Sequence, residues 1–377
     1  MLFLGILASA QALRTLAFRI VDNRIVSPVM INGKGPFQCI IDTGVSSIIS
    51  TATASALGLH VSMNGRTAGV GEKRLPQGRV TIESISIAGV ELKNVSTAVI
   101  SFDDMVPVFG TVRIDAVLGT PLFEHHAVTV DYDRKVLTIA NEASAQHLQA
   151  GTAIPIDFSG IPVVEAKLDG VPGRFGVDLG ARSALLLYTP FIEKNNLRQK
   201  YKARYNTITG WGVGGPVRSQ LARANTLEIG SLVVRDIVIR LSTQSAGATT
   251  GSSFDGLIGP DVLRQFVTTF DYPHNRVLFE KGTDYGIHDC YDRLGAWLAQ
   301  GDDGFPVLDV IPGSAAELAG LRKDDVVVSV DGMRADHLVL PHLRDSFRTM
   351  PVGTKVQLRV KRDKQVLHLV AKPKDVI

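Results

Sequence analysis

A pattern that occurs twice restricts the folds open to this chain. Asp42 ends an apolar run and is followed by Xaa-Gly, and Asp178 does the same 136 residues later. A carboxylate placed after a buried strand costs free energy unless it is hydrogen-bonded or shares a proton. Two such carboxylates at equivalent places in two copies of one unit can meet at a pseudo-two-fold axis. That is the arrangement that a proton-sharing acid/base pair needs.

Other short matches recur in the same order and at nearly the same offset. They pair Asn32-Gly33 with Asp169-Gly170, Ala116-Val117-Leu118-Gly119 with Gly256-Leu257-Ile258-Gly259, Asp131-Tyr132 with Asp271-Tyr272, and Val136-Leu137 with Val277-Leu278. Several matches in one order at a nearly constant spacing indicate a repeat. The sequence therefore predicts that the chain contains an internal duplication of a unit of about 130 residues.

Within each unit the residue pattern predicts β structure. Alternating and β-branched residues fill 80–87 and 233–240, and Gly-containing dipeptides separate such runs. This pattern is typical of half-buried strands joined by tight turns. Short helices are expected over 120–125 and 260–266, because each of these segments has a proline in its first turn.

The C-terminal part of the chain predicts a separate α+β module of about 85 residues. Strands are expected over 305–310 and 326–330, and Ser314 and Gly320 are placed as the N-cap and the C-terminal stop of a short helix between them. A second helix over 337–349 and strands over 355–360 and 365–370 close the module.

Composition describes a soluble globular protein and excludes some classes of function. Among 377 residues 45% are hydrophobic and 20% charged, and the net charge of +3 gives no argument for nucleic-acid binding. The two cysteines provide neither a disulfide framework nor a metal motif. No run of 18 apolar residues predicts a membrane span.

The N-terminus has two interpretations. Residues 1–8 are apolar and Ala8-Ser9-Ala10 resembles a small-residue cleavage site, although no basic residue precedes Arg14. A signal or leader over 1–15 would place the protein in the periplasm or outside the cell. The alternative is an ordinary first strand, or a misplaced start codon, in a cytoplasmic protein.

The run Asp42-Thr43-Gly44, with Ala116-Val117-Leu118-Gly119 downstream, resembles the signature of retropepsin-like aspartic proteases. The resemblance implies a mostly β fold: two pseudo-symmetric β-barrel lobes, over 16–147 and 148–285, followed by the small α+β domain. It also implies roles for individual residues. The catalytic residues would be Asp42 and Asp178. The residues that form or support the active-site loops would be Thr43, Gly44, Leu179, Gly180, Gly119 and Gly259.

Leu179 departs from the family pattern. In the family, each lobe places a Thr after its Asp, and each hydroxyl hydrogen-bonds to the loop of the other lobe. Leu179 has no hydroxyl, so we expect half of this brace to be missing, at a cost on the order of 1 kcal/mol. The two carboxylates would remain, although less firmly positioned.

Family members also close flexible hairpins over their substrates. The residues implied for such flaps are Gly69, Val70 and Gly71 in lobe one and Gly210, Trp211 and Gly212 in lobe two. Their glycines would supply hinge freedom, and Trp211 would pack on a substrate side chain. The alternative is a pair of ordinary β-turns.

The module over 286–377 resembles a PDZ domain of the kind attached to bacterial proteases, on the strength of Pro312-Gly313-Ser314-Ala315-Ala316 and the strands around it. The resemblance implies a peptide-binding loop at Leu294, Gly295, Ala296 and Trp297, whose backbone N–H groups would capture a peptide C-terminus. The alternative is a PDZ fold that serves as a brace between domains.

The function expected from this reading is hydrolysis of peptide bonds by a water held between Asp42 and Asp178. No metal ion or other cofactor is expected, since His125-His126 has no third ligand at a suitable spacing. The expected substrate is a peptide or an unfolded protein, and the expected state is a monomer. A non-catalytic peptide-binding protein is the main alternative; a homodimer that pairs lobe one with itself is another.

Overall fold

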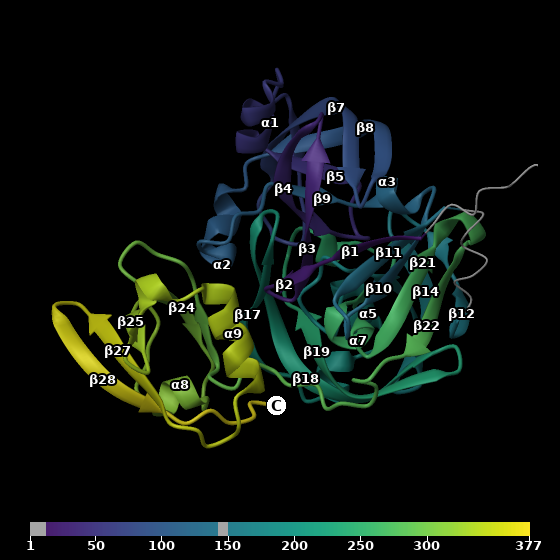
Figure 1. Ribbon diagram of the computed structural model, residues 1–377. Coiled ribbons are helices and arrows are strands. Elements are labelled where there is room, and N and C mark those ends of the chain that lie inside the picture. Colours follow the sequence, from purple (N-terminus) through teal and green to yellow (C-terminus); the bar gives the residue numbers. More distant parts are fainter. Residues whose placement is uncertain (1–12, 142–149) are drawn as a thin grey trace, which may run out of the picture.

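The computed structural model describes residues 13–141 and 150–377. The predicted leader over 1–15 therefore lies outside the described residues, apart from its last positions. The chain forms two β lobes and a C-terminal domain set to one side of them (Figure 1).

Each lobe is built on one eight-stranded sheet. In lobe one the spatial order is β2 (Arg19–Val21), β3 (Arg24–Ile31), β4 (Lys34–Ile41), β9 (Ala116–Leu118), β5 (Ser47–Ser50), β8 (Val90–Ile100), β7 (Leu75–Ile87) and β6 (Gly65–Thr67). In lobe two it is β13 (Asp157–Phe158), β14 (Pro162–Leu168), β15 (Val171–Val177), β20 (Gly256–Ile258), β16 (Leu185–Leu187), β19 (Leu232–Ser242), β18 (Gly215–Ile229) and β17 (Arg204–Gly212).

The two sheets have the same topology. In each, the third strand of the order pairs in parallel with a three-residue strand, β4 with β9 and β15 with β20. Each sheet also curls until a further pairing joins β3 to β7 or β14 to β18. The predicted mostly β fold with two lobes related by duplication is confirmed.

A six-stranded sheet joins the lobes, in the order β1 (Arg14–Ala17), β11 (Val136–Ala140), β10 (Ala127–Asp131), β21 (Phe266–Asp271), β22 (Arg276–Lys281) and β12 (Thr152–Pro155). At its centre β10 of lobe one pairs with β21 of lobe two. Thr129 and Thr269, 140 residues apart, face each other there with their hydroxyl oxygens 2.7 Å apart. The pseudo-two-fold axis expected from the repeat therefore passes close to this pair.

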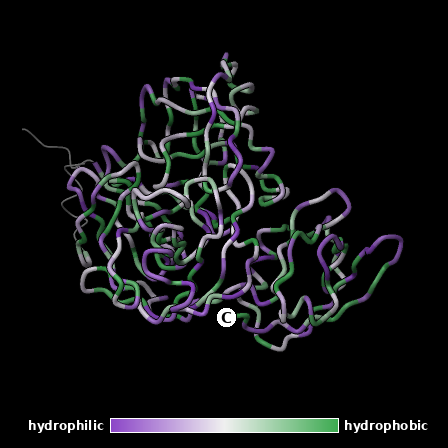
Figure 2. The backbone as a smooth tube through the Cα atoms, turned by 180° about the vertical axis from the view of Figure 1, so that it is seen from behind, coloured by the Kyte–Doolittle hydropathy of each residue, from purple (hydrophilic) through white to green (hydrophobic). Residues whose placement is uncertain are grey.

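One continuous apolar core runs through both lobes, and a separate one fills the C-terminal domain. Along the strands, hydrophobic and hydrophilic residues alternate in many places (Figure 2), as sheets with one covered face require. Fully buried phenylalanines, among them Phe123 and Phe270, pack edge to face between the lobes. The active-site loops are thus fixed to a rigid scaffold.

Helices are short and lie at the edges of the lobes. They are α1 (Thr51–Leu57), α2 (Val106–Phe109), α3 (Thr120–Phe123), α5 (Thr189–Lys194), α6 (Leu197–Lys200) and α7 (Pro260–Leu263), with 3-10 turns η1 (Asp103–Met105), η2 (Ala248–Thr250) and η3 (Tyr272–His274). The helices predicted over 120–125 and 260–266 are present but end earlier. In lobe two the reason is that Phe266 already pairs with Lys281 in β21.

The C-terminal domain has the predicted α+β elements. They are β23 (Ala296–Leu298), β24 (Phe305–Val310), α8 (Ala315–Leu318), β25 (Val326–Val330), β26 (Met333–Arg334), η4 (Ala335–His337), α9 (Leu340–Thr349), β27 (Val356–Arg362) and β28 (Gln365–Ala371). The Ser314 hydroxyl caps α8, as predicted. The helix predicted from residue 337 begins instead at Leu340, because Pro341 is tolerated only in the first helical turn.

The C-terminal domain packs against both lobes. The chain ends at this junction (Figure 1), where Arg223 Nη2 donates to the carbonyl oxygen of Ile377 at 3.2 Å. Helix α9 contacts α2 of lobe one, and Asp309 of β24 accepts a 3.0 Å hydrogen bond from the Ile208 N–H of β17 in lobe two. Within the described part of the chain, no helix is long and apolar enough to cross a membrane.

Candidate active site

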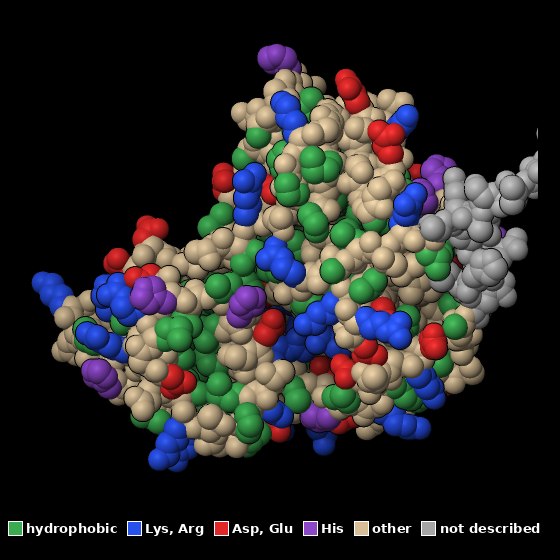
Figure 3. Space-filling model, in the orientation of Figure 1, with side chains coloured by type: hydrophobic (Ala, Val, Ile, Leu, Met, Phe, Trp, Pro, Cys, Tyr) green, Lys and Arg blue, Asp and Glu red, His purple; other side chains and the backbone are tan. Residues whose placement is uncertain are grey.

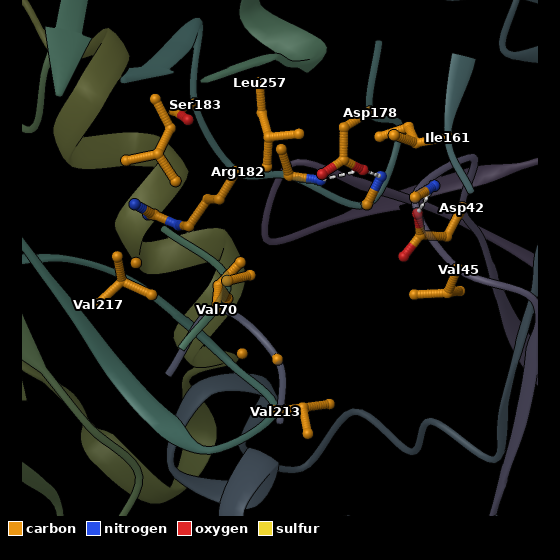
Figure 4. Close-up of a pocket in the computed structure, with 18 of the residues that line it drawn as sticks. Asp42, Val45, Val70, Ile161, Asp178, Arg182, Ser183, Val213, Val217 and Leu257 are labelled. Carbon is orange, nitrogen blue, oxygen red and sulfur yellow. Dashed lines mark hydrogen bonds between the residues drawn. The ribbon is translucent and has the colours of Figure 1, made fainter. Parts of the chain in front are cut away.

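Asp42 and Asp178 lie together at the interface of the two lobes. Each follows a strand, β4 or β15, and its carboxylate is turned back on its own loop. Oδ1 of Asp42 accepts the N–H of Gly44 at 2.6 Å, and Oδ1 of Asp178 accepts that of Gly180 at 2.8 Å. The two carboxyls lie close enough together for each to shift the pKa of the other. The structure therefore brings together the pair that the repeat singled out (Figure 4).

The loops need glycine at residues 44 and 180 because the carboxylates of the two aspartates come close to their Cα atoms. A Cβ on Gly180 would lie 2.1 Å from Oδ2 of Asp42. A Cβ on Gly44 would lie 3.1 Å from Oδ1 of Asp178 and 3.2 Å from Oδ1 of Asp42. Each loop thus fits against the carboxylate of the other lobe only because it carries no side chain at this point.

The apolar-Gly strands β9 and β20 support the loops from below. The backbone N–H of Asp42 donates to the carbonyl of Leu118 at 3.1 Å, and that of Asp178 to the carbonyl of Ile258 at 2.8 Å. A Cβ on Gly119 would lie 1.9 Å from the Val45 carbonyl oxygen, and one on Gly259 would lie 2.3 Å from that of Ser183. Gly119 and Gly259 therefore lie beneath the loops, where the sequence placed them.

Thr43 of lobe one hydrogen-bonds to the active-site loop of lobe two, but the equivalent side chain of lobe two returns no such bond. The Thr43 hydroxyl donates to the Val177 carbonyl of lobe two at 2.7 Å and accepts the N–H of Leu179 at 3.0 Å. Leu179 is fully buried and has no hydroxyl with which to return these bonds. The cross-brace is thus half complete, as the sequence predicted, and a buried apolar side chain fills the other half.

Both carboxyls are held by the protein at raised pKa values. Burial raises the pKa of Asp42, while the N–H of Gly44 and the neighbouring groups lower it in part. Burial raises the pKa of Asp178 well above its usual value, and the charge of Asp42 raises it further. Because two adjacent buried carboxylates cannot both ionise cheaply, the pair retains one proton over a wide pH range.

The pair opens onto a cavity of about 410 Å³. Its lining is mainly apolar and includes Val45, Val70, Ile161, Val213, Val217 and Leu257, which Figure 4 shows around the two aspartates. Such a cavity, with a few polar groups converging at one place, is the usual form of a ligand or substrate site. Within residues 13–141 and 150–377, no cluster of His, Cys, Asp and Glu side chains is suited to hold a metal ion.

Comparison with known families agrees with this geometry. A sequence model described as aspartyl protease matches residues 27–122 and 164–262, one segment in each lobe. The chain belongs to the aspartyl protease family. The model of the PDZ domain matches residues 292–372, so this aspartyl protease family member ends in a PDZ domain, which implies peptide binding.

Two curated relatives resemble a short part of this aspartyl protease family member. They are the probable periplasmic serine endoproteases, DegP-like, of Chlamydia trachomatis and Chlamydia muridarum, each 38% identical over 63 residues. That stretch is 17% of this chain and 12% of either relative. So short a shared segment does not transfer their serine endoprotease activity.

The two predicted flaps meet over the cavity of the protease lobes. The N–H of Gly71 donates to the carbonyl of Val213 at 3.0 Å, and a Cβ on Gly71 would lie 2.2 Å from the carbonyl carbon of Gly214. Trp211 lines the cavity, but its indole N–H donates to the carbonyl of Asp104 in lobe one at 2.7 Å. Trp211 therefore links the flap of lobe two to lobe one.

A buried charge cluster behind the active site was not predicted from the sequence. We call it the Asp22 cluster: Asp22, Arg24, Arg182 and Arg344. Oδ2 of Asp22 accepts from Arg24 at 2.6 Å, and Oδ1 accepts from Arg182 at 2.8 Å and from Arg344 at 3.2 Å. Burial raises the pKa of Asp22, but the three arginine charges outweigh burial and hold it well below its usual range.

The Asp22 cluster connects the C-terminal domain to the active-site loop of lobe two. Arg182 stands just beyond that loop, and Arg24 donates to the Gly180 carbonyl within it at 2.9 Å and to the Trp211 carbonyl at 3.1 Å. Arg344 belongs to α9. The only sequence signal for the cluster was the position of Arg182, four residues after Asp178.

The predicted PDZ peptide-binding loop faces lobe two in this conformation. Leu294 and Trp297 are buried, and the N–H of Gly295 donates to Oδ1 of Asp292 at 2.8 Å. The Trp297 ring lies between two guanidiniums of the Asp22 cluster, 5.2 Å from that of Arg182 and 4.7 Å from that of Arg344. The loop is therefore occupied by contacts within the protein.

The half-complete brace predicts a measurable role for Thr43. Thr43→Val leaves the buried Val177 carbonyl and Leu179 N–H without their partner, so we expect the free energy of unfolding to fall by about 1–3 kcal/mol. Peptidase activity should fall with it, since both active-site loops lose a shared anchor. Denaturant titration of Thr43→Val beside Thr43→Ser, which keeps the hydroxyl, provides the measurement. Equal stability of the two variants would contradict the brace.

Proposed function

We propose that the protein is an aspartic endopeptidase that hydrolyses peptide bonds with a water molecule held between Asp42 and Asp178. The observation that carries the proposal is that Asp42 and Asp178, at equivalent places in the two lobes, meet at one cavity, where a Cβ on Gly44 would lie 3.1 Å from Oδ1 of Asp178 and 3.2 Å from Oδ1 of Asp42. They lie at a largely apolar cavity that two hairpins cover. A carboxyl pair that shares one proton supplies a base and an acid at the same place.

In this mechanism the ionised carboxylate is that of Asp42, because its charge raises the pKa of Asp178 and keeps Asp178 protonated. Asp42 takes a proton from the water as the water oxygen attacks the carbonyl carbon of the substrate. Asp178 donates a hydrogen bond to the carbonyl oxygen and then passes its proton to the leaving nitrogen as the C–N bond breaks. The pair again holds one proton at the end of the reaction.

We propose that the PDZ-like domain acts as a brace in this conformation, through Trp297 and the Asp22 cluster. Capture of a substrate or partner C-terminus at 294–297 remains our proposal for a second state. Because the ring of Trp297 lies against Arg182 of lobe two, that state requires the domain to move away from lobe two. Binding of a peptide at 294–297 and contact of Trp297 with Arg182 would then be mutually exclusive.

The pH dependence of cleavage tests the proposed function. Activity should rise with pH as the pair loses its first proton and fall as it loses the second. Because burial and the charge of Asp42 raise the pKa of Asp178, the falling limb should lie above about 3.9, the usual pKa of an aspartate. The measurement is release of peptides from a denatured protein mixture between pH 2 and pH 9.

Two results of this measurement would contradict the proposal. Activity that already falls with rising pH below about 3.9 would show that the pair does not retain a shared proton. Peptide binding without cleavage at every pH would favour the alternative, a non-catalytic peptide-binding protein whose second lobe has degenerated at Leu179. Binding is measured separately, by fluorescence anisotropy of labelled peptides.

A further inference from the structure

One end of the active-site cavity carries more positive charge than the protein neutralises. Arg182 and Arg240 both line the cavity, and only 7% and 6% of their surfaces are exposed. Figure 4 shows Arg182 and Val217 on the side of the cavity away from Asp42. Arg240, from β19, donates through Nη1 to the Thr209 carbonyl of the lobe-two flap at 2.8 Å.

Few of the guanidinium nitrogens at this end have partners. Arg182 is bonded to Asp22 through Nε, and Arg240 to Thr209 through Nη1. Among the described residues, the two Nη nitrogens of Arg182 and Nη2 of Arg240 donate no hydrogen bond to a protein acceptor. A buried cationic donor without an acceptor is costly, and such groups are normally paired. The missing partner is therefore an acceptor that the protein itself does not provide.

The charge balance indicates that this acceptor is an anion. Within the described residues, Asp22 is the only carboxylate in an ion pair with Arg24, Arg182 or Arg344, and none forms an ion pair with Arg240. Asp292 and Asp345 lie near Arg182, but burial raises the pKa of both and favours their neutral forms. Asp261 lies near Arg240 but is ion-paired with Arg348. Burial also lowers the pKa of Arg240 to about 10, so Arg240 remains charged at neutral pH.

We propose that the Arg182–Arg240 end of the cavity is a subsite for a carboxylate group of the peptide substrate. This inference rests on the proposed peptidase function and adds a substrate class to it. Guanidiniums bind carboxylates through paired, charge-assisted hydrogen bonds. The carboxylate belongs either to a Glu or Asp side chain at one position beside the scissile bond or to the free C-terminus of the substrate.

The test compares kcat/KM for matched peptides. Fluorogenic peptides carry Glu or Gln at each position around the cleaved bond in turn, and a parallel set carries a free or an amidated C-terminus. We expect one position, or the free C-terminus, to favour the carboxylate by about tenfold or more, the usual effect of a charged hydrogen bond. The first set detects a side-chain carboxylate and the second a terminal one.

Variants of Arg240 assign the preference to this subsite. Arg240→Met should bring the carboxylate-to-amide ratio close to one, and Arg240→Lys, which keeps the charge, should retain part of the preference. Arg235→Met is the matched control, because Arg235 is exposed on the same strand; it should leave the ratio unchanged. Circular dichroism and thermal unfolding verify that each variant is folded.

Two outcomes would overturn the inference while leaving the peptidase function intact. One is cleavage with no preference for a carboxylate at any position or at the C-terminus. The other is a preference that survives in Arg240→Met. If the wild type cleaves no peptide, the proposed function fails instead, and anisotropy with the same peptides decides on the subsite. Equal binding of carboxylate and amide peptides would then overturn it.

Discussion

Asp42→Asn and Asp178→Asn should each lower kcat/KM for peptide hydrolysis by roughly 10²- to 10⁴-fold, the usual contribution of a positioned acid or base. An amide at residue 42 cannot accept the proton of the water. An amide at residue 178 can still donate a hydrogen bond to the substrate carbonyl, but it cannot pass a proton to the leaving nitrogen. The measurement is initial-rate cleavage of a fluorogenic peptide at the pH optimum of the wild type.

Stability distinguishes loss of chemistry from loss of fold in these variants. The pKa of Asp178 is higher in the folded than in the unfolded protein. As the pH rises from the unfolded to the folded value, this residue therefore lowers the free energy of unfolding progressively. Asp178→Asn removes this penalty, and we expect its Tm at neutral pH to equal or exceed that of the wild type. Asp302→Asn, at an exposed loop position, is the control for both measurements.

Full activity in Asp178→Asn would show that lobe two is not catalytic. The homodimer alternative, in which lobe one pairs with itself, would then become the better explanation. The meeting of Asp42 and Asp178 at one cavity within a single chain argues against it. The expected monomer is therefore tested together with the dyad, by measuring the molar mass of the active protein in solution.

The sequence was enough to predict the active-site residues that occur at equivalent positions in both repeats. Asp42, Asp178, Gly119 and Gly259 each follow or end a short apolar strand, and each recurs in the other unit. Local pattern and symmetry are enough to predict that such residues lie in the active site, because strand pairing within each lobe brings the aspartate and the glycine of that lobe together. Strands β4 with β9, and β15 with β20, provide that pairing.

The Asp22 cluster could not be predicted, because contacts distant in sequence create it. Asp22 meets Arg182 across 160 residues and Arg344 across 322. A single aspartate in a hairpin turn is usually a solvated turn residue, and Asp22 does occupy such a turn, with φ 48°. Asp22 is buried where lobe two and the C-terminal domain both reach it, and the duplication contains no information about that domain.

One face of α9 contributes charged contacts to the docking of the C-terminal domain. Arg344 reaches Asp22, and Arg348, one turn later, reaches Asp261 of lobe two at 2.9 Å. In Figure 3 basic side chains lie at the bottom of the hollow between this domain and lobe two, and Arg348 and Asp261 line the cleft between α9 and lobe two. Charged contacts therefore contribute to holding the domain on the protease lobes, and Asp22, which Arg344 reaches, also binds Arg24 and Arg182 beside the loop of Asp178.

Asp22→Asn should accordingly have the largest effect on stability of any single substitution at this junction. It leaves three buried guanidiniums without their carboxylate, and breaking a buried ion pair from one side costs about 3–5 kcal/mol. Arg24 and Arg182 would then lose the group that positions them beside the loop of Asp178, so we expect kcat/KM to fall by about 10- to 100-fold as well. Denaturant unfolding and initial rates measure the two effects.

The pH dependence of this contribution has a defined sign. The folded-state pKa of Asp22 is depressed, so its stabilisation is fully present above the unfolded value of about 3.9 and is lost as the pH falls through the folded one. The stability difference between the wild type and Asp22→Asn should therefore be constant near neutral pH and shrink only in strong acid. A difference that shrinks already between pH 7 and pH 5 would contradict this assignment.

A control and a second variant separate the cluster from its parts. Asp363→Asn changes an exposed turn aspartate with φ 53°, so it should alter neither stability nor activity. Arg344→Met removes only the contribution of the C-terminal domain and keeps the pairs of Asp22 with Arg24 and Arg182. If Arg344→Met lowers activity as Asp22→Asn does, the C-terminal domain positions the catalytic loop. If it lowers stability alone, the domain is a passive attachment and Arg24 and Arg182 are positioned within the protease lobes.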